Sequence, residues 1–203
     1  MILLLDNYDS FTFNLHHYLE QLSSEEIVVK RNDEITVTDA ASYTGIVLSP
    51  GPGLPAEAGI MPELIRVLGP SIPILGICLG HQAIGEAYGA HLENLENVLH
   101  GVQREVIIEP PADKLFTKMP NRFPVGHYHS WVISLSDLPP VLSVTAKDTH
   151  GHIMAVSHKE HPVSGVQFHP ESILTENGMK ILENWLHFCK SFGEKRNSAV
   201  HSG

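Results

Sequence analysis

The chain has 203 residues, of which 42% are hydrophobic and 18% charged, a balance typical of one globular domain with a well-buried core. Its formal net charge of −10 argues against nucleic acid or an anionic membrane as a partner, since both need clustered Lys and Arg. The apolar run at 1–5 ends at Asp6, too short for a signal peptide or a spanning helix. Two cysteines form no disulfide framework. We therefore expect a cytoplasmic protein without membrane contact.

The first half of the chain alternates short apolar strands with helices. A strand at Ile2–Leu5 leads into a polar turn, in which Ser10 is a good N-cap for a helix over Phe11–Leu22. Further strands are expected at Ile27–Val29 and Gly45–Leu48. This alternation predicts an α/β fold with a mixed, mainly parallel open sheet covered by helices on both faces, and functional groups at the carboxyl ends of its strands.

Residues 49–55, Ser-Pro-Gly-Pro-Gly-Leu-Pro, follow the third strand and contain three prolines and two glycines. Such a density excludes a helix or a central strand and predicts a rigid loop whose amides point in a fixed direction. A plain tight turn would explain a single Pro-Gly. This concentration directly after a strand favours a preorganised binding loop.

The stretch at 72–82, Ile-Pro-Ile-Leu-Gly-Ile-Cys-Leu-Gly-His-Gln, predicts a buried strand that turns sharply into a helix with Cys78 at the apex. Gly76 and Gly80 flank the cysteine, as the tight turn of a nucleophile elbow requires. The sulfur then lies at a helix N-terminus, where partial positive charge favours the thiolate. A lone buried Cys is more often core packing, and the elbow alone fits esterases, peptidases and amidotransferases alike.

The second half changes to short strands separated by turn residues, which predicts a smaller antiparallel sheet. The clearest of these strands are Arg104–Glu109, Trp131–Leu135, Leu142–Ala146 and Ile153–Val156. The helices expected elsewhere are Pro62–Leu68 and one beginning at His81.

A last strand at Gly165–Phe168 leads into His169-Pro170-Glu171. Because Pro170 disfavours helical geometry at the preceding residue, His169 and Glu171 are presented together just beyond a strand end. Taken singly, each has a bland explanation, a core histidine and a solvated carboxylate.

The C-terminal region predicts one amphipathic helix from about Thr175 to Cys189. Cys189 belongs to its apolar face and is not a second nucleophile. Residues 191–203 are polar and without period, so we expect a domain over 1–190 and a disordered tail over 191–203.

Fourteen histidines raise the question of a metal site. His127 and His129, or His150 and His152, are the candidate pairs, but neither pair has a third ligand at a recognisable zinc spacing. We expect no metal and no cofactor in this chain.

A thiol that attacks an acyl carbon needs a base, a group that orients the base, and donors for the oxyanion. Cys78, His169 and Glu171 fill the first three roles. The backbone amides of Leu79 and Gly53 are the candidate oxyanion donors. The constellation predicts acyl transfer through a thioester and leaves the acyl donor open.

Three blocks of the sequence resemble the signature blocks of class I, triad-type glutamine amidotransferases: Pro-Gly-Pro-Gly at 50–53, Gly-Ile-Cys-Leu-Gly-His-Gln at 76–82 and Gly-Val-Gln-Phe-His-Pro-Glu-Ser at 165–172. The opening Leu-Leu-Leu-Asp-Asn-Tyr-Asp-Ser-Phe-Thr-Phe-Asn-Leu and Tyr-His-Ser at 128–130 are similar to the amidotransferase components of anthranilate synthase and 4-amino-4-deoxychorismate synthase. The resemblance spans residues 1–190 and implies a flavodoxin-like fold.

The resemblance implies a glutaminase that passes ammonia to a chorismate-utilising synthase subunit, component I of either synthase, which would carry the magnesium. Cys78 would be the nucleophile, His169 the base and then the acid, and Glu171 the orienting group. By the same carry-over, L-glutamine would be held by residues of the loop and the pocket: Gly51, Pro52, Gly53, Gln82, Ser130 and Trp131.

Two positions depart from the family pattern, Val102 where a Lys is usual and Trp131 where an aliphatic residue is commoner. Val102 is expected at the surface that docks the partner subunit, and Trp131 at the rim of the glutamine pocket. Two further hypotheses stay open, a non-catalytic subunit that stabilises the synthase and a free-standing γ-glutamyl hydrolase that needs no partner.

Overall fold

The computed structural model describes residues 1–200, apart from the side chains at 96–98, 197, 199 and 200. It contains a nine-stranded sheet in the order β2-β1-β3-β4-β9-β8-β7-β5-β6. The strands are β1 (Ile2–Asp6), β2 (Ile27–Arg31), β3 (Gly45–Leu48), β4 (Ile74–Ile77), β5 (Leu92–Ile108), β6 (Arg122–Ile133), β7 (Leu142–Asp148), β8 (Ile153–His158) and β9 (Val163–Val166).

The sheet has a parallel half and an antiparallel half. Strands β2, β1, β3, β4 and β9 pair in parallel, and β8, β7, β5 and β6 continue from β9 with antiparallel pairing. The predicted mixed α/β fold is confirmed. The expected smaller antiparallel sheet is not separate: its strands extend the parallel sheet, because β8 bonds directly to β9. Two predicted strands were too short, since β5 and β6 begin well before the segments that the pattern indicated.

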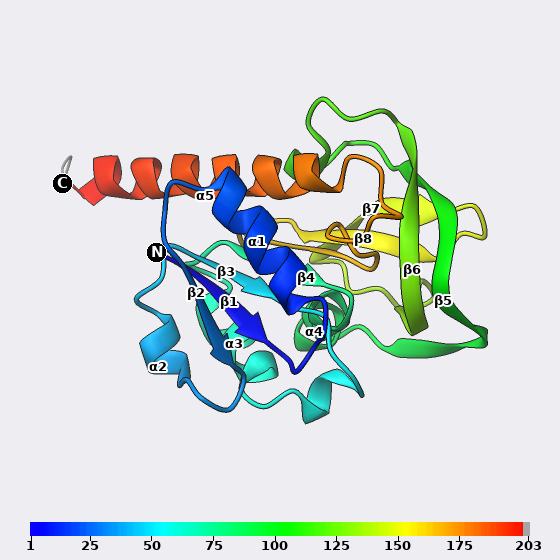
Figure 1. Ribbon diagram of the computed structural model, residues 1–203, viewed down its shortest axis with the longest axis horizontal. Helices are drawn as coiled ribbons and strands as arrows, with labels where there is room; N and C mark the ends of the chain where they lie inside the picture. The colour runs from blue at the N-terminus through cyan, green and yellow to red at the C-terminus, as the bar shows by residue number, and fades with distance from the viewer. Residues whose placement is uncertain (201–203) are drawn as a thin grey trace.

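Helices cover both faces of the parallel half (Figure 1). They are α1 (Thr12–Leu22), α2 (Val37–Ala40), α3 (Met61–Leu68), α4 (Leu79–Ala87) and α5 (Gly178–Val200), with short 3-10 helices η1 (Pro55–Glu57) and η2 (Lys114–Phe116). Alternate residues of β1 separate two cores: Ile2 and Leu4 pack with α1 and α5, whereas Leu3 and Leu5 pack with α3 and α4. Burial on both faces explains why the parallel strands read as continuous apolar runs.

The start of α1 differs from the prediction. The helix begins at Thr12, and Ser10 does not cap it. Two aspartates accept the hydrogen bonds of this turn instead. Asp9 Oδ2 accepts from Phe11 N at 2.7 Å, and Asp6 Oδ1 accepts from Thr12 Oγ1 at 2.8 Å. The carboxylates are preferred over the Ser10 hydroxyl because they are charged acceptors at a helix N-terminus.

The end of the chain also differs. Helix α5 continues to Val200, so the expected disordered tail is wrong for residues 191–200, while 201–203 lie outside the described residues. Figure 1 shows α5 running across one face and extending past the sheet. Arg196 Nη1 donates to Ser71 O at 2.7 Å, a contact that holds the polar extension to the body. Among residues 1–200, no helix has the length and apolar character needed to cross a membrane.

Candidate active site

Cys78 lies at the apex of the turn between β4 and α4. Its φ of 52° and ψ of −100° place a non-glycine residue in a strained backbone conformation, as at a nucleophile elbow. A Cβ on Gly76 would lie 2.5 Å from the backbone of Gly80, and one on Gly80 would lie 2.6 Å from Leu48 O. The two flanking glycines are therefore required by close backbone contact, as predicted.

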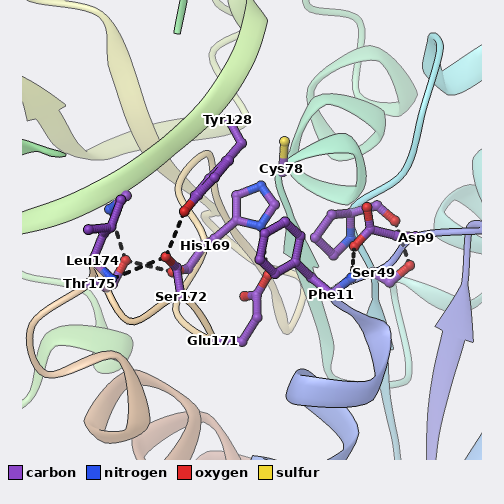
Figure 2. A network of polar contacts seen from close by, with 12 residues as sticks. Asp9, Phe11, Ser49, Cys78, Tyr128, His169, Glu171, Ser172, Leu174 and Thr175 are labelled. Carbon is purple, nitrogen blue, oxygen red and sulfur yellow. Dashed lines mark hydrogen bonds and ion pairs between the residues drawn. The ribbon is translucent and has the colours of Figure 1, made fainter. Parts of the chain in front are cut away.

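His169 and Glu171 follow β9, which pairs with β4, so the base and the cysteine emerge from neighbouring strands. His169 Nδ1 and Glu171 Oε1 are 2.6 Å apart, and both side chains are buried. Nε2 of His169 has no hydrogen-bond partner among the described residues. Figure 2 shows the imidazole between Cys78 and Glu171. The structure therefore brings Cys78, His169 and Glu171 together, with the imidazole hydrogen-bonded to the carboxylate and its free nitrogen on the side of the sulfur.

The charge on His169 is favoured by its neighbours. Burial works against the charged ring, but the Cys78 sulfur and the Glu171 carboxylate outweigh it and raise the pKa of His169 well above 6.5. A raised pKa suits a histidine that holds a proton beside a thiolate and later delivers it.

Gln167 is a residue of this site that the sequence interpretation missed. Its Nε2 donates to Cys78 Sγ at 3.6 Å, and its Oε1 accepts from Gln82 Nε2 at 3.3 Å. Gln82 also donates to Trp131 O at 3.0 Å. The sequence did contain a signal for Gln167: it is a polar residue at the end of an apolar strand. It also lies two positions before His169, and side chains two positions apart in a strand face the same side of the sheet.

Two aromatic rings enclose the imidazole. The rings of Phe11, from the β1–α1 turn, and Tyr128, from β6, have centroids 5.1 and 4.9 Å from that of His169, and Figure 2 shows all three together. Tyr128 Oη lies 3.1 Å from Ser172 Oγ, and Thr175 Oγ1 donates to His169 O at 2.6 Å. These contacts restrict the ring and its backbone, and none was predicted as part of the site.

A pocket of about 180 Å³ opens beside Cys78. It brings together seven of the predicted residues, namely Gly51, Gly53, Cys78, Leu79, Gln82, Ser130 and Trp131. Its other lining residues are Leu99, His100, Tyr128 and His129. Pro52 was predicted to bind substrate but lines a neighbouring cavity of about 370 Å³ on the other side of the loop.

The structure shows what the candidate histidine pairs contact. His127 Nδ1 lies 2.9 Å from His129 Nε2, and His152 Nδ1 lies 2.9 Å from Asp148 Oδ2, so each pair is engaged in local hydrogen bonding. Within the described part of the chain, no group of three or more His, Cys, Asp or Glu side chains is arranged to hold a metal ion.

An elbow cysteine beside a buried histidine and carboxylate, at the carboxyl edge of a parallel sheet, defines the class: an α/β enzyme equipped for nucleophilic attack by sulfur on an acyl carbon. The family follows from comparison with known proteins. The chain belongs to the class-I glutamine amidotransferases, whose family model matches residues 3–189, and it is a glutamine amidotransferase.

Similar proteins agree with this assignment. Aminodeoxychorismate/anthranilate synthase component 2 of Bacillus subtilis is 43% identical over 92% of this chain and 95% of its own length. Anthranilate synthase component 2 of Mycobacterium tuberculosis is 46% identical over 93% of this chain and 82% of its own. A solved structure described as a putative GMP synthase protein from Thermoplasma acidophilum matches with a TM-score of 0.86 and 26% identity, covering 97% of this chain and 96% of that one.

Proposed function

We propose that this chain is the glutaminase subunit of an anthranilate synthase, which hydrolyses L-glutamine and supplies ammonia to a chorismate-utilising partner subunit. The observation that carries the chemistry is the row of Cys78, His169 and Glu171 beside the pocket. Relatives with the names of both synthases match most of the chain, so the equivalent role in 4-amino-4-deoxychorismate synthase, or a dual role, is the second candidate.

The reaction begins with the thiolate of Cys78 and the imidazolium of His169. Sulfur attacks the carboxamide carbon of glutamine, a C–S bond forms, and the carbonyl electrons move to oxygen, where the amides of Leu79 and Gly53 donate to the oxyanion. His169 then gives its proton to the amide nitrogen, the C–N bond breaks and ammonia leaves. A glutamyl thioester remains on Cys78.

Hydrolysis of the thioester uses the same groups in reverse. Neutral His169 takes a proton from water as the water oxygen attacks the thioester carbon, and the C–S bond breaks to release glutamate and the thiolate. Glu171 keeps Nδ1 protonated and the ring oriented throughout, as its 2.6 Å contact with His169 allows.

The substrate is held by the residues that surround the sulfur. We assign the glutamine contacts to Gly51, Gly53 and Gln82, to backbone groups of Ser130 and Trp131, and to Pro52 through its effect on the shape of the loop. This chain uses no metal or cofactor in the proposal, and the magnesium belongs to the partner. The complex is cytoplasmic and involves neither nucleic acid nor membrane.

A diazo-ketone analogue of glutamine tests the proposal. The chain is incubated with the analogue in the presence of its co-purified synthase partner, and the adduct is mapped by peptide mass spectrometry. Label is expected on Cys78 alone. Cys189 is the internal control, because burial raises the pKa of its thiol and it is packed against the core.

Label elsewhere, or full glutaminase activity in Cys78→Ala, would contradict the proposal. Amination that runs on ammonia but never on glutamine would favour the non-catalytic stabilising role. Rapid glutamyl hydrolysis by the isolated chain, unchanged by the synthase partner, would favour the free-standing hydrolase.

A further inference from the structure

Asn7 is a buried polar residue for which the proposed reaction has no use. It follows β1, the residue is 3% exposed, and it lines the cavity beside Pro52 of the 49–55 loop, which is distinct from the Cys78 pocket. A buried amide is costly unless all of its hydrogen bonds are made. The partners that satisfy Asn7 therefore indicate what it does.

Asn7 bonds to the first residue of the loop from both its backbone and its side chain. Its backbone N–H donates to Ser49 Oγ at 2.9 Å, and its Nδ2 donates to Ser49 O at 2.9 Å. Ser49 Oγ in turn donates to Pro50 O at 2.6 Å. Asn7 thus holds the Ser49–Pro50 peptide unit directly, and it holds the next unit through the Ser49 hydroxyl.

Steric contact holds the next residue. A Cβ on Gly51 would lie 2.7 Å from both the Cβ and the backbone oxygen of Asn7, and 2.9 Å from Leu79 Cδ2. The loop therefore passes between Asn7 and Leu79. These are the loop and the residue that provide the two proposed oxyanion donors, Gly53 N–H and Leu79 N–H.

The amide of Asn7 is itself fixed by contacts on its far side. Its Oδ1 accepts from Asn32 Nδ2 at 3.0 Å, and its Nδ2 also lies 3.3 Å from Met61 Sδ. Asn32 N donates to Asp6 O at 3.1 Å, which anchors this support to the parallel sheet. The Asn7 side chain thus connects the loop to the sheet, and its contacts with Ser49, Asn32 and Met61 fix its orientation.

We propose that Asn7 is the positioning residue for the oxyanion loop: it sets the direction of the Gly53 amide by fixing Ser49, Pro50 and Gly51. The inference rests on the proposed function, in which that amide stabilises the tetrahedral intermediate. It assigns Asn7 no contact with glutamine and no part in forming the thiolate.

The isosteric variant Asn7→Asp tests this role, because it keeps the shape but puts a carboxylate oxygen in place of the donor to Ser49 O. With the co-purified synthase partner, we expect kcat for glutaminase to fall about 100-fold with KM changed less than about threefold, since the lost contact acts on the transition state. Alkylation of Cys78 by iodoacetamide in the full chain needs no oxyanion donor, so its rate should stay within about twofold.

Tyr8→Phe is the matched control in the same turn. Its hydroxyl donates to Asp33 at 2.7 Å on the surface, and its loss should leave kcat within about twofold of the unmodified chain, because it leaves the Ser49 contacts intact. Should Asn7→Asp fail to fold, Ser49→Ala is the second variant, because it removes the acceptor for Asn7 N and the donor to Pro50 O. We again expect kcat to fall while the alkylation rate stays almost unchanged.

A folded Asn7→Asp or Ser49→Ala chain with normal kcat would overturn the inference, and so would a parallel fall in kcat and alkylation rate. An equal loss in Tyr8→Phe would do the same. Failure of the proposed function looks different, because the unmodified chain itself would then show no glutamine-dependent turnover.

Discussion

His169 and Glu171 form a buried ion pair beside Cys78. Both side chains are almost completely excluded from solvent, with 3% and 0% exposure. A charge in such a position persists only when it is paired. The raised pKa of His169 therefore depends on the sulfur on one side and the carboxylate on the other.

Glu171→Gln tests this dependence at the residue scale. The substitution removes a charge that raises the pKa of His169, so the imidazolium should be lost at a lower pH than in the unmodified chain. We expect kcat for glutaminase to fall by about 100-fold or more, because the ring also loses the group that orients it. Histidine NMR titration and glutaminase kinetics provide the measurements.

Glu176→Gln is the control for that variant, because Glu176 is an exposed carboxylate five residues further along the chain. Its neutralisation should change neither quantity. An unshifted His169 titration in Glu171→Gln would show that the carboxylate does not hold the proton.

At the scale of single elements, the β4–α4 elbow is built by exclusion of side chains. A Cβ on Gly76 or Gly80 would lie 2.5 or 2.6 Å from backbone atoms, closer than any real Cβ contact, and the absence of these side chains lets the start of α4 pack onto β3 and β4. Glycine at both positions indicates that the helix packs closely against the strands. For this reason the elbow could be predicted from the sequence alone.

Gly80→Ala should destabilise the elbow by about 2 kcal/mol or more, because its Cβ would lie 2.6 Å from Leu48 O and the helix must move. Glutaminase activity should fall with it, since Cys78 moves too. Urea unfolding and kinetics measure both effects.

Gly193→Ala in α5 provides the opposite case. No described atom lies within 4 Å of a Cβ at that position, so the substitution should stabilise the helix by about 0.5–1 kcal/mol and leave activity unchanged. Equal effects at the two glycines would contradict the packing account.

The elements show how far the sequence could be interpreted. The strand Gly45–Leu48 was predicted with its observed bounds, and the elbow with both glycines, because these features depend on local pattern. Phe11, Gln167 and Asn7 were missed as site residues because their roles depend on which strands become neighbours. The helix beyond residue 190 was missed because a polar stretch carries no apolar period, and its anchor, Arg196 on Ser71, is a long-range contact.

At the scale of the whole molecule, the burial of neutral histidines links stability to pH, and the effect is largest for His81, His127 and His129. Burial lowers the pKa of His81 to about 3, of His127 to about 4 and of His129 to about 3. In an unfolded chain each has a pKa of about 6.5. Below about pH 6.5 the unfolded chain therefore binds protons that the folded chain excludes, and stability falls as the pH falls toward 4.

His169 offsets only a small part of this loss, because its stabilising effect grows as the pH falls from 7 toward 6.5 and changes no further at lower pH, where the ring is protonated in both states. We expect the free energy of unfolding to be several kcal/mol lower at pH 5 than at pH 7, with about 2 kcal/mol from each buried histidine. Urea unfolding at the two pH values measures it.

His81→Leu should shrink the difference between pH 5 and pH 7 by about 2 kcal/mol, because the proton that His81 excludes from the folded state no longer counts. The substitution is apolar at a position with no exposed surface, so the variant should fold. Equal stability of the unmodified chain at the two pH values would contradict the account of the buried histidines.

The covalent intermediate on Cys78 is the central claim, and acid quenching during turnover measures it most directly. Labelled glutamine is mixed with the full chain and its synthase partner, and the quenched, digested sample is analysed by mass spectrometry with and without hydroxylamine. We expect a hydroxylamine-sensitive glutamyl group on the peptide that contains Cys78, and none on the peptide that contains Cys189. Steady turnover with glutamyl label on another residue, or turnover that persists in Cys78→Ala, would contradict the claim.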